Sequence, residues 1–155
     1  MMNSFANILT LSALSVAVAA SALADDKNVR YLSLYNNGGY NIDPVILKWK
    51  DSDGKVHDKN MGAKIGKGEA ICIDLNDKDY VAIGDQVWFV AHIEAGDTES
   101  CKKSNKRFKA DNDAVWYTFM GGTTFNNNRC QNSDIKSYTA STRVKGNSTY
   151  CAPVQ

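Results

Sequence analysis

Residues 84–96 carry the most regular pattern of apolar and polar positions in the chain. Glycines bound this stretch, and β-branched and aromatic residues fill it, which is typical of a central β-strand. Alternate side chains of a strand point to opposite faces of the sheet. One face is wholly apolar, so we expect it to be buried: Val87, Phe89, Ala91 and Ile93. The other face becomes polar toward Gly96: Trp88, Val90, His92 and Glu94.

Shorter alternating stretches recur along the chain and predict further strands. We expect these over residues 29–36, 45–50, 55–60, 69–75, 115–120 and within 135–144. Residues 36–39 and 51–54 are rich in Asn, Asp and Gly and are typical of tight turns. Pro44 cannot donate a hydrogen bond to a sheet, so we expect it at a sheet edge or a strand start.

The stretch 69–75 predicts a clear division of faces, with Ile71, Ile73 and Leu75 inward and Cys72 on the opposite side. Residues 96–113 form a long polar connection with no predicted strand, and no segment beyond the N-terminal one has the periodicity of a helix. Seven or eight short strands predict an all-β fold, a small antiparallel β-sandwich or partly open barrel.

The N-terminal residues 1–24 are typical of a secretory signal peptide. An uncharged apolar run ends at Ala22-Leu23-Ala24, a small-x-small cleavage site, and the charged Asp25 follows. A membrane anchor is the competing interpretation, but the run is too short and too rich in Ala and Ser to span comfortably. We therefore expect a secreted or periplasmic protein, not an integral membrane protein, with a single β-sandwich domain over residues 25–155.

Four cysteines lie in the predicted mature chain: Cys72, Cys101, Cys130 and Cys151. An even number in an exported chain predicts two disulfides. Four cysteines allow three pairings, and we favour Cys72 with Cys101 and Cys130 with Cys151, since both would close local loops.

The formal net charge of +1 gives no overall attraction to nucleic acid, so none is expected as a partner. One local run is strongly basic and could bind an anionic polymer or lipid surface; it contains Lys102, Lys103, Lys106 and Arg107. The alternative is a solvated loop that acidic neighbours partly neutralise.

A second candidate site combines aromatic rings with amides: Trp116, Tyr117, Asn126, Asn127, Asn128 and Arg129. Rings can cover the C–H faces of a sugar, while amides and charges bind its hydroxyls. The alternative is that one ring belongs to the core and that the Asn run is a loop tolerating positive φ.

Catalytic and metal motifs are weak. The only histidines are His57 and His92, and neither HExxH nor Gly-x-Ser-x-Gly occurs. Asp74 and Asp85 could act as an acid–base pair only if the fold brings them together. Residues 51–54 resemble the start of a calcium loop, but Gly62 stands where the twelfth-position Glu is required. We expect no enzyme activity, no metal and no cofactor.

These patterns predict an exported, non-catalytic binding domain that recognises a glycan or an anionic lipid or polymer through loops at one end of the sandwich. The alternative is a proteinaceous inhibitor or immunity-type protein. It would present residues 96–109, held by Cys101, to the cleft of a partner enzyme.

Overall fold

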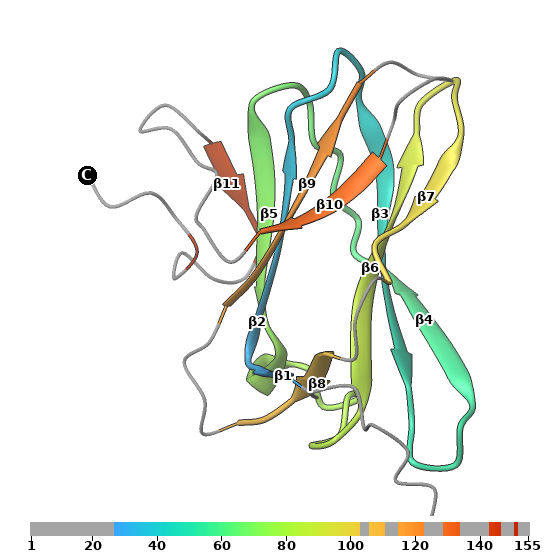
Figure 1. The fold of residues 1–155 in the computed structure, drawn as a ribbon, viewed down its shortest axis with the longest axis vertical. Helices are drawn as coiled ribbons and strands as arrows, with labels where there is room; N and C mark the ends of the chain where they lie inside the picture. The colour runs from blue at the N-terminus through green and yellow to red at the C-terminus, as the bar shows by residue number, and fades with distance from the viewer. Residues whose placement is uncertain are drawn as a thin grey trace, which may run out of the picture.

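The computed structural model describes residues 27–102, 106–110, 115–122, 129–133, 143–146 and 151. The strands in these ranges form two sheets, which confirms the predicted all-β class (Figure 1). The sheets do not close on each other, as in a sandwich or open barrel. The predicted signal peptide lies outside the described residues.

The first sheet has six strands in the order β1-β8-β6-β3-β4, with β7 also paired to β6. Its strands are β1 (Lys27–Val29), β3 (Ile42–Lys50), β4 (Val56–Asn60), β6 (Gln86–Ile93), β7 (Thr98–Ser100) and β8 (Lys106–Phe108). The predicted central strand is β6, which contacts β3, β7 and β8.

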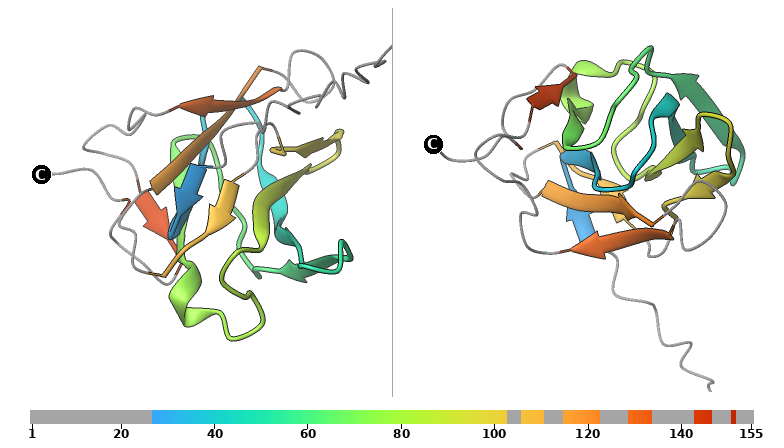
Figure 2. Two further views of the ribbon diagram at one scale, coloured as in Figure 1. Left: turned by 60° about the horizontal axis from the view of Figure 1, so that its bottom comes forward. Right: turned by 90° about the horizontal axis from the view of Figure 1, so that it is seen from above.

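The second sheet has five strands in the order β10-β9-β2-β5-β11. Its strands are β2 (Tyr31–Asn36), β5 (Glu69–Asp74), β9 (Val115–Gly121), β10 (Arg129–Ser133) and β11 (Arg143–Lys145). A single 3₁₀ turn, η1 (Leu75–Asp77), follows β5. Figure 2 shows the two sheets from two further directions.

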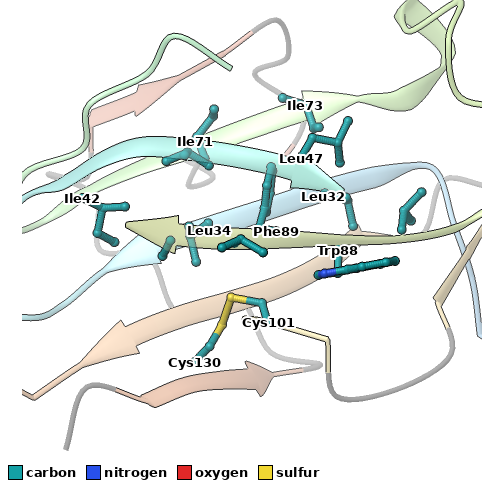
Figure 3. Close-up of a cluster of buried hydrophobic side chains, with 14 of the residues drawn as sticks. Leu32, Leu34, Ile42, Leu47, Ile71, Ile73, Trp88, Phe89, Cys101 and Cys130 are labelled. Carbon is teal, nitrogen blue, oxygen red and sulfur yellow. A yellow bond between two sulfur atoms is a disulfide. The ribbon is translucent and has the colours of Figure 1, made fainter. Parts of the chain in front are cut away.

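The apolar face of β6 lies in the core, as its alternation predicts. Phe89 is at the centre of a cluster that includes Leu32 and Leu34 of β2 and Leu47 of β3 (Figure 3). The opposite face is more buried than expected, because Trp88 and Val90 are also covered. The Cys101–Cys130 disulfide lies beside Trp88 (Figure 3) and covers part of that face.

Pro44 is the third residue of β3 and precedes Ile46, where the pairing with β4 begins, so it lies near the strand start, as expected. The β3–β6 register shifts between Ile42 and Val45, so a bulge accommodates the missing donor. The turn at residues 51–54 is confirmed: the Gly54 amide donates to the Asp51 carbonyl at 3.1 Å.

The chain passes from one sheet to the other at Arg30, between β1 and β2. The Arg30 guanidinium binds both carboxylate oxygens of Asp74, at 2.7–3.1 Å. Not all pairs are antiparallel: β1 runs parallel to β8, β2 to β9, and β5 to β11.

The disulfide pairing expected from sequence is wrong. The bonds are Cys72–Cys151 and Cys101–Cys130. Cys72 alternates with the inward Ile71 and Ile73, so it lies on the opposite face of β5, in a small cluster with Cys151. Cys101 belongs to the main core instead. Cys151 still fixes the C-terminal tail, but it fixes the tail to β5.

The polar connection after residue 96 contains two short strands, β7 and β8, that the sequence did not predict. Both pair with β6, so the connection folds back onto its own sheet. These two strands, together with β1 and with β10, which the sequence did not predict either, raise the strand count above the expected seven or eight.

Candidate functional site

The predicted basic run does not form one surface in the residues that the structure describes. Lys102 is exposed, and its ammonium lies over the Trp88 ring, 4.3 Å from the centroid. Lys106 is only 5% exposed, so it is not a solvated loop residue. Arg107 is half-buried and donates from Nη1 to the Gly84 carbonyl at 3.0 Å. Lys103 lies outside the described residues.

The predicted aromatic and amide group is only partly placed. Trp116 and Tyr117 are consecutive residues of β9, whose backbone pairs with Leu32 and Ser33 of β2. Arg129 begins β10 and is exposed. The three asparagines, Asn126, Asn127 and Asn128, lie outside the described residues.

The structure instead brings together a groove that sequence patterns did not indicate. It lies between the segment that follows β4 and the strands β5 and β11 of the second sheet, and has a volume of about 490 Å³. In Figure 1 this segment is the coil that leads from β4 to β5. The groove is lined by Met61, Gly62, Ala63, Lys64, Ile71, Ile73, Lys78, Lys145 and Gly146. It thus combines an apolar floor with a lysine-rich rim.

Two of the three rim lysines are paired with glutamates. Lys64 Nζ donates to both carboxylate oxygens of Glu94 at 2.9 Å. Lys145 Nζ donates to Glu69 Oε2 at 2.7 Å and to the Lys64 carbonyl at 2.6 Å. The second bond joins β11 to the segment that follows β4, so Lys145 connects the two sides of the groove.

Glu69 anchors this connection. Its Oε2 accepts the Lys145 ammonium and the Gly66 amide, and Arg143 contacts its other oxygen. The Lys145 hydrogen bond, followed by that of the Gly66 amide, holds the pKa of Glu69 below its usual value. The carboxylate is therefore ionised at neutral pH and keeps β11 attached.

Lys78 differs from the other two. Among the described residues of the groove, it is the lysine whose ammonium makes neither a hydrogen bond nor an ion pair with a carboxylate. Its backbone amide closes η1 on the Leu75 carbonyl at 3.0 Å, which fixes the start of the side chain. The charge of Lys78 helps to lower the pKa of Asp74, but no hydrogen bond within the described residues holds the ammonium in place.

The position of β11 depends on close backbone packing. Gly146, at φ +105°, leaves no room for a side chain, because a Cβ there would lie 2.2 Å from the Cys72 carbonyl oxygen. The Cys72–Cys151 disulfide fixes the chain five residues later. One wall of the groove therefore rests on a glycine and a disulfide.

The candidate catalytic residues have structural partners. His92 Nδ1 lies 2.9 Å from the Thr98 hydroxyl, and Asp85 accepts the Ala82 amide at 2.9 Å. Asp74 is occupied by Arg30. Within the described ranges, no three His, Cys, Asp or Glu residues gather as metal ligands, and no helix is long and apolar enough to cross a membrane.

No protein-family model matches this chain, and no curated protein sequence does. Among solved structures, a disulfide-locked mutant of intermedilysin with human CD59 gives a TM-score of 0.38 at 11% identity, covering 68% of this chain and 24% of that chain. Pneumolysin gives 0.38 at 13% identity, covering 67% and 23%. This chain thus spans about a quarter of their length. TM-scores below 0.5 do not establish a shared fold.

Proposed function

We propose that this protein is a non-catalytic binding domain that holds an anionic amphiphile in the groove between the segment that follows β4 and the strands β5 and β11. The observation that carries this proposal is an apolar floor, with Met61, Ala63 and Ile71, beside the ammonium of Lys78. An aliphatic chain would lie on the floor, and its anionic head would meet Lys78.

The size and chemistry of the groove support this ligand class. Small-molecule sites have volumes of about 300–1,000 Å³ and are mostly apolar, with a few placed polar groups. Each methylene moved from water to such a floor contributes about 0.8 kcal/mol. A chain of several carbons would supply most of the affinity, and Lys78 would select for an anion.

Two disulfides support a place outside the reducing cytosol. With the predicted signal peptide, they favour a secreted or periplasmic protein. Its ligand would then be a free fatty acid or an anionic membrane lipid, which share a chain and a negative head.

Titration calorimetry with dodecanoate, dodecanol and acetate tests the proposal. We expect dodecanoate to bind best, dodecanol about tenfold more weakly for lack of a charge-assisted contact, and acetate not at all. Phosphatidylglycerol vesicles form a second arm. Vesicle binding without free dodecanoate binding would indicate a membrane lipid as the source.

Two variants locate the site. Ala63→Phe fills the groove from a partly exposed position, and Lys78→Gln removes the available charge. Both should weaken dodecanoate binding by about tenfold or more. Lys55→Gln is the matched control, because Lys55 is an exposed residue of the β3–β4 turn. The proposal is wrong if neither dodecanoate nor the vesicles bind, or if Lys55→Gln weakens binding as much as Lys78→Gln.

A further inference from the structure

A second pocket, of about 380 Å³, lies at the turn between β3 and β4. It is lined by Lys50, Asp51, Ser52, Gly54, Gln86 and Arg107, none of which lines the groove. Its lining is mainly polar, so it requires a different ligand.

Three neighbouring strands place the main side chains in a row. Lys50 of β3 pairs with Gln86 of β6, and Gln86 pairs with Arg107 of β8. Residues directly opposite on adjacent antiparallel strands stand side by side on one face. Lys50 and Arg107 thus lie on either side of an amide, so that two cations flank a hydrogen-bonding group.

The one carboxylate of the pocket is already engaged. Asp51 Oδ1 accepts the Lys55 amide at 2.9 Å, and Oδ2 lies 2.6 Å from His57 Nε2. The His57 hydrogen bond holds the pKa of Asp51 below its usual value, so the group stays ionised. The His57 ring stacks on Trp49, with centroids 5.3 Å apart and planes 16° apart. The carboxylate is thereby held against the turn and the histidine.

The charge balance of the lining is therefore positive. Two cations face one carboxylate, and the turn amide and His57 satisfy that carboxylate. The bond from Arg107 to the Gly84 carbonyl fixes the guanidinium in the pocket wall. Lys50 is exposed at the mouth. An anion is the complementary ligand.

We infer that this pocket binds an acidic sugar residue, one that carries a carboxylate or a sulfate. The two cations would bind the acidic group, and the Gln86 amide and the Ser52 hydroxyl would bind ring hydroxyls. The volume suits a ligand larger than a bare anion. This inference does not depend on the amphiphile proposed for the groove. The pocket also differs from the aromatic and amide group that the sequence predicted as a sugar site, because the two share no residue.

Titration of the intact, oxidised protein with glucuronate, glucose 6-sulfate, glucose and acetate tests the inference. We expect an acidic sugar to bind at least about tenfold more tightly than glucose or acetate, since its charged and its hydroxyl contacts both contribute. The ratio of glucuronate to glucose 6-sulfate affinity tells which acidic group is preferred. Saturating dodecanoate should not change either affinity.

Variants of the two cations and of the carboxylate should change the affinity for acidic sugars differently. Lys50→Gln and Arg107→Gln should each weaken acidic-sugar binding by about tenfold, whereas Asp51→Asn removes a negative charge and should leave binding equal or tighter. Lys55→Gln makes the same charge change on an exposed residue that does not line the pocket, and it should have little effect. Because Lys50 is exposed, its variant should fold even if the Arg107 variant does not. Binding of glucose as tight as glucuronate, no binding of any probe, or equal effects of Lys50→Gln and Lys55→Gln would each overturn the inference.

Discussion

Removal of the Cys72–Cys151 disulfide should cost more stability than removal of Cys101–Cys130. The first bond closes a sequence separation of 79 residues and the second closes 29. A crosslink restricts the unfolded chain more strongly when the loop is longer. The comparison is between the double variants Cys72→Ala/Cys151→Ala and Cys101→Ala/Cys130→Ala.

The loop-entropy relation sets the magnitude. It gives about 4.5 kcal/mol for the 79-residue separation and about 3.6 kcal/mol for the 29-residue one at 25 °C. All four cysteines are at most 1% exposed, so the packing lost with each pair of sulfurs is similar and largely cancels. The first variant should therefore be less stable than the second by about 1 kcal/mol.

Urea unfolding of the oxidised proteins at neutral pH measures both values. Dodecanoate titration below the transition provides a second readout. The first variant removes the bond that holds the chain after β11. Because β11 supplies Lys145 to the groove wall, dodecanoate binding should fall. In the second variant the groove keeps its disulfide, and binding should persist.

The reverse order of stability would refute the loop argument. Unchanged dodecanoate affinity in the first variant, with the fold retained, would show that β11 keeps its place without the disulfide. The dependence of the groove on that bond would then be wrong.

Four further outcomes are expected. Burial raises the pKa of Asp74, but the bonds from Arg30 and the Asn76 amide outweigh it and leave the pKa below its usual value. The resulting stability is present above the unfolded-state pKa and is lost as the pH falls through the folded-state pKa. Urea midpoints should therefore drop in acid, and less so in Asp74→Asn. Gly146→Ala should displace β11 and weaken dodecanoate binding, whereas Gly39→Ala, with nothing within 4 Å of the added Cβ, should do neither. Phe89→Ala should cost about 3–5 kcal/mol in urea unfolding, because the ring is 2% exposed at the core centre. Lys106→Ser should destabilise by more than about 1 kcal/mol, and Lys102→Ser by less, because only Lys106 is buried.

The sequence predicted what depends on neighbouring residues. Alternation identified β6 and β5 and their inward faces, because a strand in contact with a core must repeat every two residues. The β3–β4 turn was equally local, since Gly54 has a φ of +83° that favours glycine.

The sequence did not predict the features that depend on contacts between distant residues. The charge of the basic run did not indicate a strand, yet alternation within β8 buries Lys106 while Arg107 stays half-exposed. Arg107, a residue of the predicted basic run, lines the pocket at the β3–β4 turn. The residues beside it in that pocket come from β3 and β6, which are distant in the sequence. The groove joins four separate segments, so no local pattern could indicate it. The disulfide error has the same origin, because Cys72 and Cys101 belong to different clusters of the fold, which their spacing along the chain does not reveal.

The parallel pairing of β1 with β8 and of β2 with β9 also sets when this protein can fold. Lys27 pairs with Lys106, and Tyr31 pairs with Val115. The strand β5 gains its second neighbour, β11, only when Arg143 pairs with Glu69. During synthesis neither sheet can therefore be completed until most of the chain has emerged. Such distant contacts slow folding to the order of milliseconds to seconds.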